Sequence, residues 1–130
     1  MNPALIFLHK FNFLSADLSN QDFTSQIALN DNTTLSNAMS QIILYGKIVV
    51  INLSLFITNV VANQEVKLLT LPDKIRPIKG KFLIVQQGTS EWQSNKGICY
   101  GYLAATGELS VKIYDSSVTN LKIFAVYNIN

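Results

Sequence analysis

The clearest pattern in the chain is an alternation of apolar and mixed positions with period two across residues 46–58. One side of this segment is wholly aliphatic and comprises Val49, Ile51, Leu53, Leu55 and Ile57. The other side is mixed and comprises Val50, Asn52, Ser54, Phe56 and Thr58. One buried face and one partly polar face are typical of a strand in an antiparallel sheet with one side covered. The pattern predicts a long strand here.

Shorter segments of the same kind follow at regular intervals, separated by turn residues. They span residues 65–71, 81–86, 97–105, 108–114 and 121–127. The dipeptide Thr106-Gly107 predicts a hairpin between two of them. In residues 65–71, one side of the strand is expected to carry Val66, Leu68 and Thr70, and the other side Lys67, Leu69 and Leu71. Short strands at this spacing indicate an all-β fold, an antiparallel, jelly-roll-like β-sandwich.

The first forty residues have a weaker pattern. Residues 25–29 could form a strand, and Asn30-Asp31-Asn32 indicates a turn. Leu35, Ala38, Met39, Ile42 and Ile43 have helical spacing, but residues 41–45 could equally pair with the long strand, and we favour the strand. We expect residues 1–40 to be an N-terminal extension or linking segment packed on the β-sandwich that spans residues 41–130.

Composition narrows the class of protein. Apolar residues make up 48% of the chain and charged residues only 14%, so we favour burial between identical subunits over a small apolar monomer. The net charge is only +2, and the basic cluster of residues 74–81 lacks interleaved aromatics, which argues against nucleic acid. Polar residues interrupt the apolar run at 42–61, and no signal peptide is recognisable, so we expect a soluble protein without a membrane partner.

Reactive side chains are few. Cys99 is the only cysteine and is expected to be buried, and His9 is the only histidine, so we expect no metal and no cofactor. No glycine-rich phosphate loop is present. A glycosidase pair among the eight carboxylates stays open, but most of these lie in predicted turns. We therefore expect a protein that is not an enzyme.

The segment most suggestive of binding is the loop at residues 86–97. It contains the only tryptophan, Trp92, among amide and charged side chains, and a sugar needs both an aromatic face and polar partners. The alternative is that Trp92 covers the core. Tyr100 and Tyr102 share one face of the next strand and could extend the site or lie between subunits. The candidate saccharide-binding residues are Glu91, Trp92, Gln93, Asn95, Tyr100 and Tyr102.

A short motif points to a family. Residues 71–77 read LPDKIRP, and this stretch is similar to the LP-x-x-(Y)-RP signature of the C-terminal head domain of phage receptor-binding proteins and tail fibres, especially in siphophages of Gram-positive bacteria. The long strand KIVVINLSLFI precedes it, and Gly107 to Val111 resembles a further family strand. Ile75 stands where an aromatic residue is usual. Pro72 ends a strand and Pro77 keeps Arg76 extended, which leaves Arg76 free to pair with an acid or a carbonyl. We favour this structural role for Arg76 over ligand binding.

The resemblance implies a homotrimeric head at the tail tip or baseplate of a virion. Such heads bind host wall polysaccharide or teichoic acid, and their other partners are tail and baseplate proteins. Weak sites become firm when many copies engage one surface. Two alternatives remain, a structural tail or baseplate protein without receptor affinity and a cellular lectin-like carbohydrate-binding module.

Overall fold

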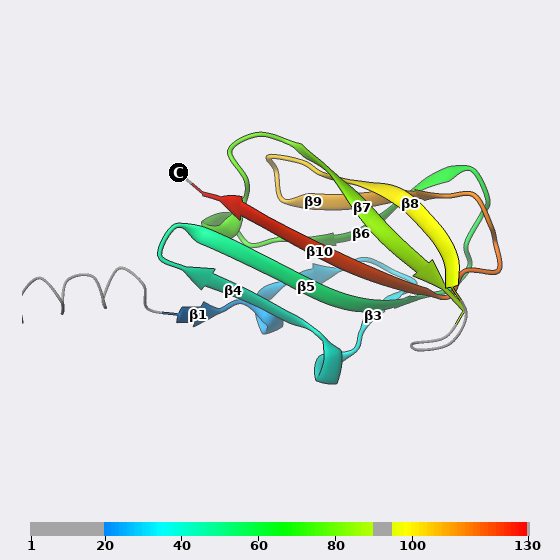
Figure 1. Cartoon of the computed structure of the whole chain (residues 1–130), viewed down its shortest axis with the longest axis horizontal. Helices are drawn as coiled ribbons and strands as arrows, with labels where there is room; N and C mark the ends of the chain where they lie inside the picture. The colour runs from blue at the N-terminus through cyan, green and yellow to red at the C-terminus, as the bar shows by residue number, and fades with distance from the viewer. Residues whose placement is uncertain (1–19, 90–94, 130) are drawn as a thin grey trace, which may run out of the picture.

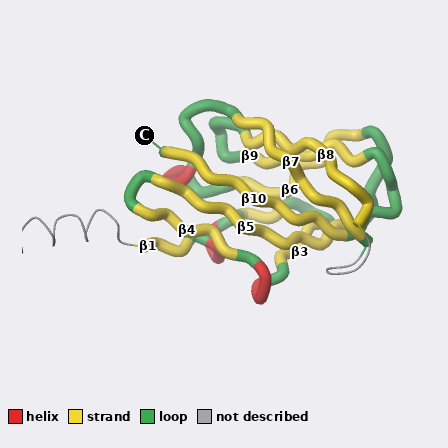
Figure 2. The backbone as a smooth tube through the Cα atoms, viewed as in Figure 1, coloured by secondary structure: helices red, strands yellow, loops and turns green. Residues whose placement is uncertain are grey.

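A computed structural model describes residues 20–89 and 95–129, and their strands form one antiparallel sheet (Figure 1). The strands are β1 (Asn20–Asp22), β2 (Ala28–Leu29), β3 (Thr33–Leu35), β4 (Gln41–Tyr45), β5 (Ile48–Ile57), β6 (Gln64–Thr70), β7 (Lys81–Gly88), β8 (Asn95–Leu103), β9 (Glu108–Ile113) and β10 (Asn120–Asn128). Their order is β1-β4-β5-β10-β7-β8-β9-β6-β2, and β3 also pairs with β5. Short 3-10 turns are the only helical segments among these residues (Figure 2). The all-β, antiparallel prediction is confirmed.

The sheet curls into a half-barrel. β10 pairs with β5 over nine consecutive residues but with β7 over only four, from Asn120 opposite Gly88 to Ile123 opposite Val85. Beyond these four pairs, β7 and β10 diverge (Figure 1). β1 and β2, at opposite ends of the strand order, are joined by residues 23–27 alone. Such a link spans at most roughly 20 Å, so the two edges of the sheet must approach each other.

The inner face of this curl holds the core, and its members follow the alternation read from the sequence. The aliphatic side of β5 is buried throughout. Alternate residues of β9 and β10 are buried in the same way, namely Leu109, Val111 and Ile113, and Leu121, Ile123, Ala125 and Tyr127. β6 departs from the expectation, because Leu68 and Leu69 are both fully buried. A register shift against β9 between Lys67 and Leu69 explains this, since a bulge changes which side the following residues face.

Residues 20–35 contribute the short strands β1, β2 and β3 to the same sheet. The strand prediction for residues 41–45 is confirmed as β4, and the helical alternative is wrong, since only a 3-10 turn at Asn37–Met39 forms. The segment at residues 25–29 is mostly not a strand, because Thr24–Gln26 makes a 3-10 turn before the short β2. The predicted turn is confirmed, with Asn32 at φ 67° and the Thr33 N–H donating to the Asn30 carbonyl at 3.2 Å.

The segment at residues 71–77 is a crossover from β6 to β7, and Arg76 holds it together. Its Nη2 lies 2.8 Å from Asp73 Oδ1, and its Nε donates to the Leu71 carbonyl at 3.3 Å. The expectation that Arg76 pairs with an acid or a carbonyl is therefore confirmed on both counts. Ile75 is fully buried, and its carbonyl accepts a hydrogen bond from the Tyr127 hydroxyl.

We predict that Phe23→Ala destabilises the protein by about 3–5 kcal/mol, the usual cost of deleting a buried phenylalanine side chain. Phe23 is 5% exposed and lies in the link between the two sheet edges, with its N–H donating to the Ile42 carbonyl at 2.9 Å. Urea denaturation measures the change. Leu29→Ala, at a more exposed position of the same segment, serves as control and should cost much less. If Phe23→Ala lowered the free energy of unfolding as little as Leu29→Ala, the Phe23 side chain would not be part of the core.

Candidate functional site: an aromatic hollow on the outer face

The outer face of the β8–β9 hairpin carries exposed aromatic side chains. The hairpin turns at Thr106-Gly107, where Gly107 has φ 86° and its N–H donates to the Ala104 carbonyl at 2.9 Å. This turn sets the register that places Tyr102 opposite Ser110 and Tyr100 opposite Lys112. Opposite residues in an antiparallel pair point to the same side of the sheet. The turn therefore places Tyr100, Tyr102 and Lys112 on the outer face, together with Ser110, which is only 4% exposed.

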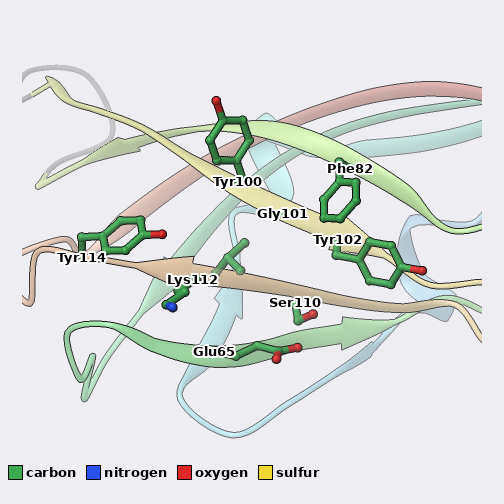
Figure 3. Close-up of a pocket in the computed structure, with 9 residues that line it drawn as sticks. Glu65, Phe82, Tyr100, Gly101, Tyr102, Ser110, Lys112 and Tyr114 are labelled. Atoms are coloured by element: carbon green, nitrogen blue, oxygen red, sulfur yellow. The ribbon is translucent and has the colours of Figure 1, made fainter.

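Neighbouring strands complete an open hollow of about 510 Å³ on this face (Figure 3). Its side chains come from four successive strands of the sheet and from the residue that follows β9. They are Phe82 on β7, Tyr100 and Tyr102 on β8, Ser110, Val111 and Lys112 on β9, Tyr114 after β9, and Glu65 on β6. The hollow is thus built on paired strands, which hold the lining residues at fixed separations.

The rings of the hollow are arranged by direct contacts. Phe82 and Tyr102 lie opposite each other on β7 and β8, with ring centroids 5.1 Å apart and planes inclined by 50°. Lys112 Nζ lies 5.8 Å from the centroid of the Tyr114 ring, within the range of a cation–π contact. Phe82 is 80% exposed and Tyr100 is 62% exposed, so both present most of their surface to a binding partner.

Gly80 provides the space in which the Tyr102 ring lies. A Cβ atom built at Gly80 would lie only 1.9 Å from Tyr102 Oη. The missing side chain at Gly80 therefore lets Tyr102 lie close to the backbone at the start of β7. This contact fixes the ring that closes one end of the hollow.

The chemistry of the lining suits recognition of a hydroxyl-rich ligand. Aromatic faces pack against C–H surfaces, while the Tyr and Ser hydroxyls, the Glu65 carboxylate and the Lys112 amine can bond hydroxyl groups. Glu65 is the single carboxylate among the described residues that line the hollow. Hydrolysis of a glycosidic bond generally requires two flanking carboxyl groups, and the described lining provides one.

The sequence-predicted site residues are distributed unevenly. Tyr100 and Tyr102 lie in the hollow, as described above. Asn95 lies at the far end of β8, roughly 20 Å from Tyr102 along the strand, and its Oδ1 accepts the Gly97 N–H at 2.8 Å. Glu91, Trp92 and Gln93 lie outside the described residues. Of the three candidate residues that the structure describes, it brings Tyr100 and Tyr102 together and leaves Asn95 apart.

The structure adds residues that the sequence reasoning missed. Ser110 and Lys112 could have been found by counting the hairpin register outward from Thr106-Gly107. Phe82 and Glu65 had no comparable signal, because they come from strands whose pairing partners are distant in sequence. Phe82 points to the same side of the sheet as Tyr102 because the two residues lie opposite each other where β7 pairs with β8.

Other chemically distinctive groups point to structural roles. Cys99 is 1% exposed, as expected, and burial raises the pKa of its thiol to about 11. Within residues 20–89 and 95–129, no three His, Cys, Asp or Glu side chains are grouped to hold a metal ion. No helix in this described part is long and apolar enough to cross a bilayer. The Thr24 hydroxyl and the Thr24 N–H both donate hydrogen bonds to the Asp22 carboxylate, and these bonds lower its pKa.

Comparison with known proteins gives no relative. A scan against models of protein families finds no match to this chain, and a search of curated proteins finds none either. The resemblance of residues 71–77 to phage head domains therefore stays a prediction.

We predict that Gly80→Ala displaces the Tyr102 ring while leaving the fold intact. The new methyl group overlaps Tyr102 Oη, and the free end of this side chain can swing away more easily than the backbone can move. The chemical shifts of the Tyr102 and Phe82 ring protons report the displacement. Unchanged shifts would contradict the observed packing. Ile78→Ala, at an exposed position just before β7, is the control and should leave both rings in place.

We predict that the Cys99 thiol is inert to a disulfide-exchange reagent in the native protein at pH 8. Its pKa, raised to about 11 by burial, keeps the thiol protonated there, and the thiolate is the reacting species. The same reagent should react fully after denaturation in urea. Rapid labelling of the native protein would show that β8 opens or that the thiol is accessible.

Proposed function

We propose that this protein is the receptor-binding head of a phage tail device and attaches the virion to saccharide on the host cell wall. The observation that carries the proposal is the aromatic hollow on the outer face of β7, β8 and β9. It combines exposed ring faces with hydroxyl, carboxylate and amine groups on a rigid sheet. A wall polysaccharide or a teichoic acid offers the matching C–H surfaces and hydroxyl groups.

The crossover at residues 71–77 gives the family resemblance a physical basis. Leu71 donates its N–H to the Gly107 carbonyl at 2.9 Å, and a Cβ built at Gly107 would lie 2.9 Å from Arg76 Nε. The motif thus supports the turn of the β8–β9 hairpin, on which the hollow is built. This arrangement explains why a proline-bounded arginine segment and a glycine turn would occur together in one sequence.

Assembly as a trimer forms the second part of the proposal. We propose that the curled sheet acts as a β-sandwich whose two halves enclose the core, and that three copies form the head at the tail tip or baseplate. The low charge content and the exposed apolar side chains of the outer face support association between copies. Many weak saccharide sites on one virion would then give firm attachment.

The proposal predicts that the protein binds wall polysaccharide or wall teichoic acid purified from Gram-positive cells, and that Tyr100→Ser weakens this binding by about tenfold. Loss of about 1.4 kcal/mol of ring contact corresponds to this factor. Isothermal titration calorimetry measures the affinity. Trp92→Ala is measured in parallel, because the sequence places its indole in the candidate loop.

Two further variants separate the possible results. Tyr100→Phe retains the ring and should keep most of the affinity, whereas Tyr45→Ser, remote from the hollow on β4, should change nothing. If Trp92→Ala weakens binding and Tyr100→Ser does not, the saccharide site is in the loop and not in the hollow. If the wild-type protein binds neither wall fraction, receptor binding is refuted, and a structural role in the tail becomes the better explanation.

A further inference from the structure

The strand β6 is only partly covered along the side that faces away from β9. Its last two residues, Leu69 and Thr70, pair with β2 on that side, and the Leu68 carbonyl accepts the Asn30 N–H at 2.9 Å. Residues 64–67 pair with β9 but have no strand partner on the other side among the described residues. This stretch is therefore an open sheet edge, and we call it the β6 edge.

The turn at residues 30–32 leaves the β6 edge uncovered. Asn32 has φ 67°, its carbonyl accepts the Thr58 N–H at 2.9 Å, and its Oδ1 accepts a hydrogen bond from Asn59 Nδ2 at 2.9 Å. These contacts direct the chain away from β6 and into β3, which pairs with β5. The chain therefore leaves β6 before it would run beside residues 64–67.

The register shows which backbone groups of the β6 edge point to the open side. In an antiparallel ladder, the N–H and C=O of one residue point to the same neighbouring strand, and successive residues alternate. The Glu108 carbonyl accepts a hydrogen bond from the residue that follows β8, so Glu108 points toward β8 and Val111 points toward β6. Val66 lies opposite Val111 and therefore bonds to β9. The backbone N–H and C=O groups of Glu65 and Lys67 consequently point to the open side.

A hollow of about 640 Å³ lies beside the β6 edge. Each of residues 64–67 lines it, and the other lining residues are residues 29–32, Asn59 and Val61. Successive side chains of a strand point to opposite faces of the sheet, so a hollow that consecutive residues line lies along the side of the strand. The hollow thus offers room for an extended segment next to unpaired backbone donors and acceptors.

The charges around this hollow favour a positively charged occupant. Asp31 and Glu65 line it, and neither carboxylate takes part in an ion pair among the described residues. Lys67 Nζ lies 3.5 Å from Glu108 Oε2, so an acid of β9 compensates its charge. A second copy that added its own β6 edge would bring the same two carboxylates, and like charges on opposite strands destabilise pairing. The complementary occupant is a strand with cationic side chains.

We propose that the β6 edge binds an extended, positively charged segment of a partner protein, which adds to the sheet as a strand beside β6. Main-chain hydrogen bonds to Glu65 and Lys67 supply affinity, and lysine or arginine side chains of the partner near Asp31 and Glu65 supply selectivity. This hollow and the aromatic hollow share Glu65 alone among their described lining residues. The contact goes beyond saccharide binding and does not depend on it.

The first test uses short synthetic peptides with blocked ends and the full-length protein. Isothermal titration calorimetry should detect binding of a peptide in which threonine and lysine alternate. A peptide of alternating threonine and glutamate should not bind, because the carboxylates at the hollow repel it. The lysine peptide methylated on its backbone nitrogens keeps its charge but cannot donate to the strand, and it should lose most of the affinity.

Variants of the protein separate backbone pairing from charge. Lys67→Pro removes a donor on the open side and keeps the bonds of Val66 to β9, as proline does on edge strands. It should weaken binding of the lysine peptide by about tenfold relative to Lys67→Ala, which loses the same amine but keeps the N–H. Asp31→Asn should weaken binding by about threefold. Ala105→Lys makes the same change in net charge at an exposed position of the β8–β9 turn and should have a much smaller effect.

Amide hydrogen exchange measured by NMR locates the bound peptide. The Glu65 and Lys67 N–H groups should exchange more slowly in the complex than in the free protein. The Val66 N–H, which bonds to β9 in both states, should change less.

Several results would overturn the proposal. They are failure of the lysine peptide to bind, equal binding of its backbone-methylated form, and protection of other strands without protection of Glu65 and Lys67. A wild-type oligomer that Lys67→Pro converts to a monomer in sedimentation equilibrium would show that a second copy occupies the edge, and the cationic partner would be wrong. If Lys67→Pro does not fold, Asp31→Asn and the exchange measurement decide. A protein that binds the peptide in this way but no wall fraction would refute the proposed function and support this inference.

Discussion

Nine consecutive residue pairs between β5 and β10 are the constraint on which the rest of the molecule depends. In an antiparallel pair each residue and its partner face the same side, so this register assigns every side chain of both strands to the inside or the outside. If β10 slipped by one residue against β5, Ile123 would face outward and Phe124 would face the core. The aliphatic inner rows of both strands therefore favour the observed facing.

Curvature converts this register into a closed core. A flat sheet would leave one inner face exposed to water, whereas here the halves on either side of the β10–β7 junction turn their inner rows toward each other. Two segments of the chain hold the sheet in this curved form. Residues 23–27 join strands from opposite edges, with Phe23 buried between them, and the crossover at residues 71–77 fastens β6 to the β8–β9 turn through Leu71 and Arg76.

The same alternation that fills the core leaves an unusual exterior. Antiparallel sheets commonly present polar residues to water, yet β7, β8 and β10 present Phe82, Ile84, Tyr100 and Phe124. These residues are not needed inside, where inward residues such as Leu83, Val85 and Ile123 already fill the space. Exposed rings lie beside polar groups at the hollow, and other exposed apolar side chains lie elsewhere on the outer face. Part of the apolar content of the chain is therefore on the outside of the sheet.

The sequence by itself determined the strands after residue 46, their inward rows, the β8–β9 hairpin, the burial of Cys99 and the pairing of Arg76. These features depend on local periodicity and turn chemistry, which neighbouring residues carry. Only the tertiary structure decided the bulge that buries both Leu68 and Leu69, the place of residues 20–35 at both sheet edges, and the meeting of Phe82 and Glu65 with Tyr102. These depend on pairing between strands far apart in the chain. The alternation of residues indicates which side of a strand is apolar. Which side chains lie next to that strand depends on the strands with which it pairs.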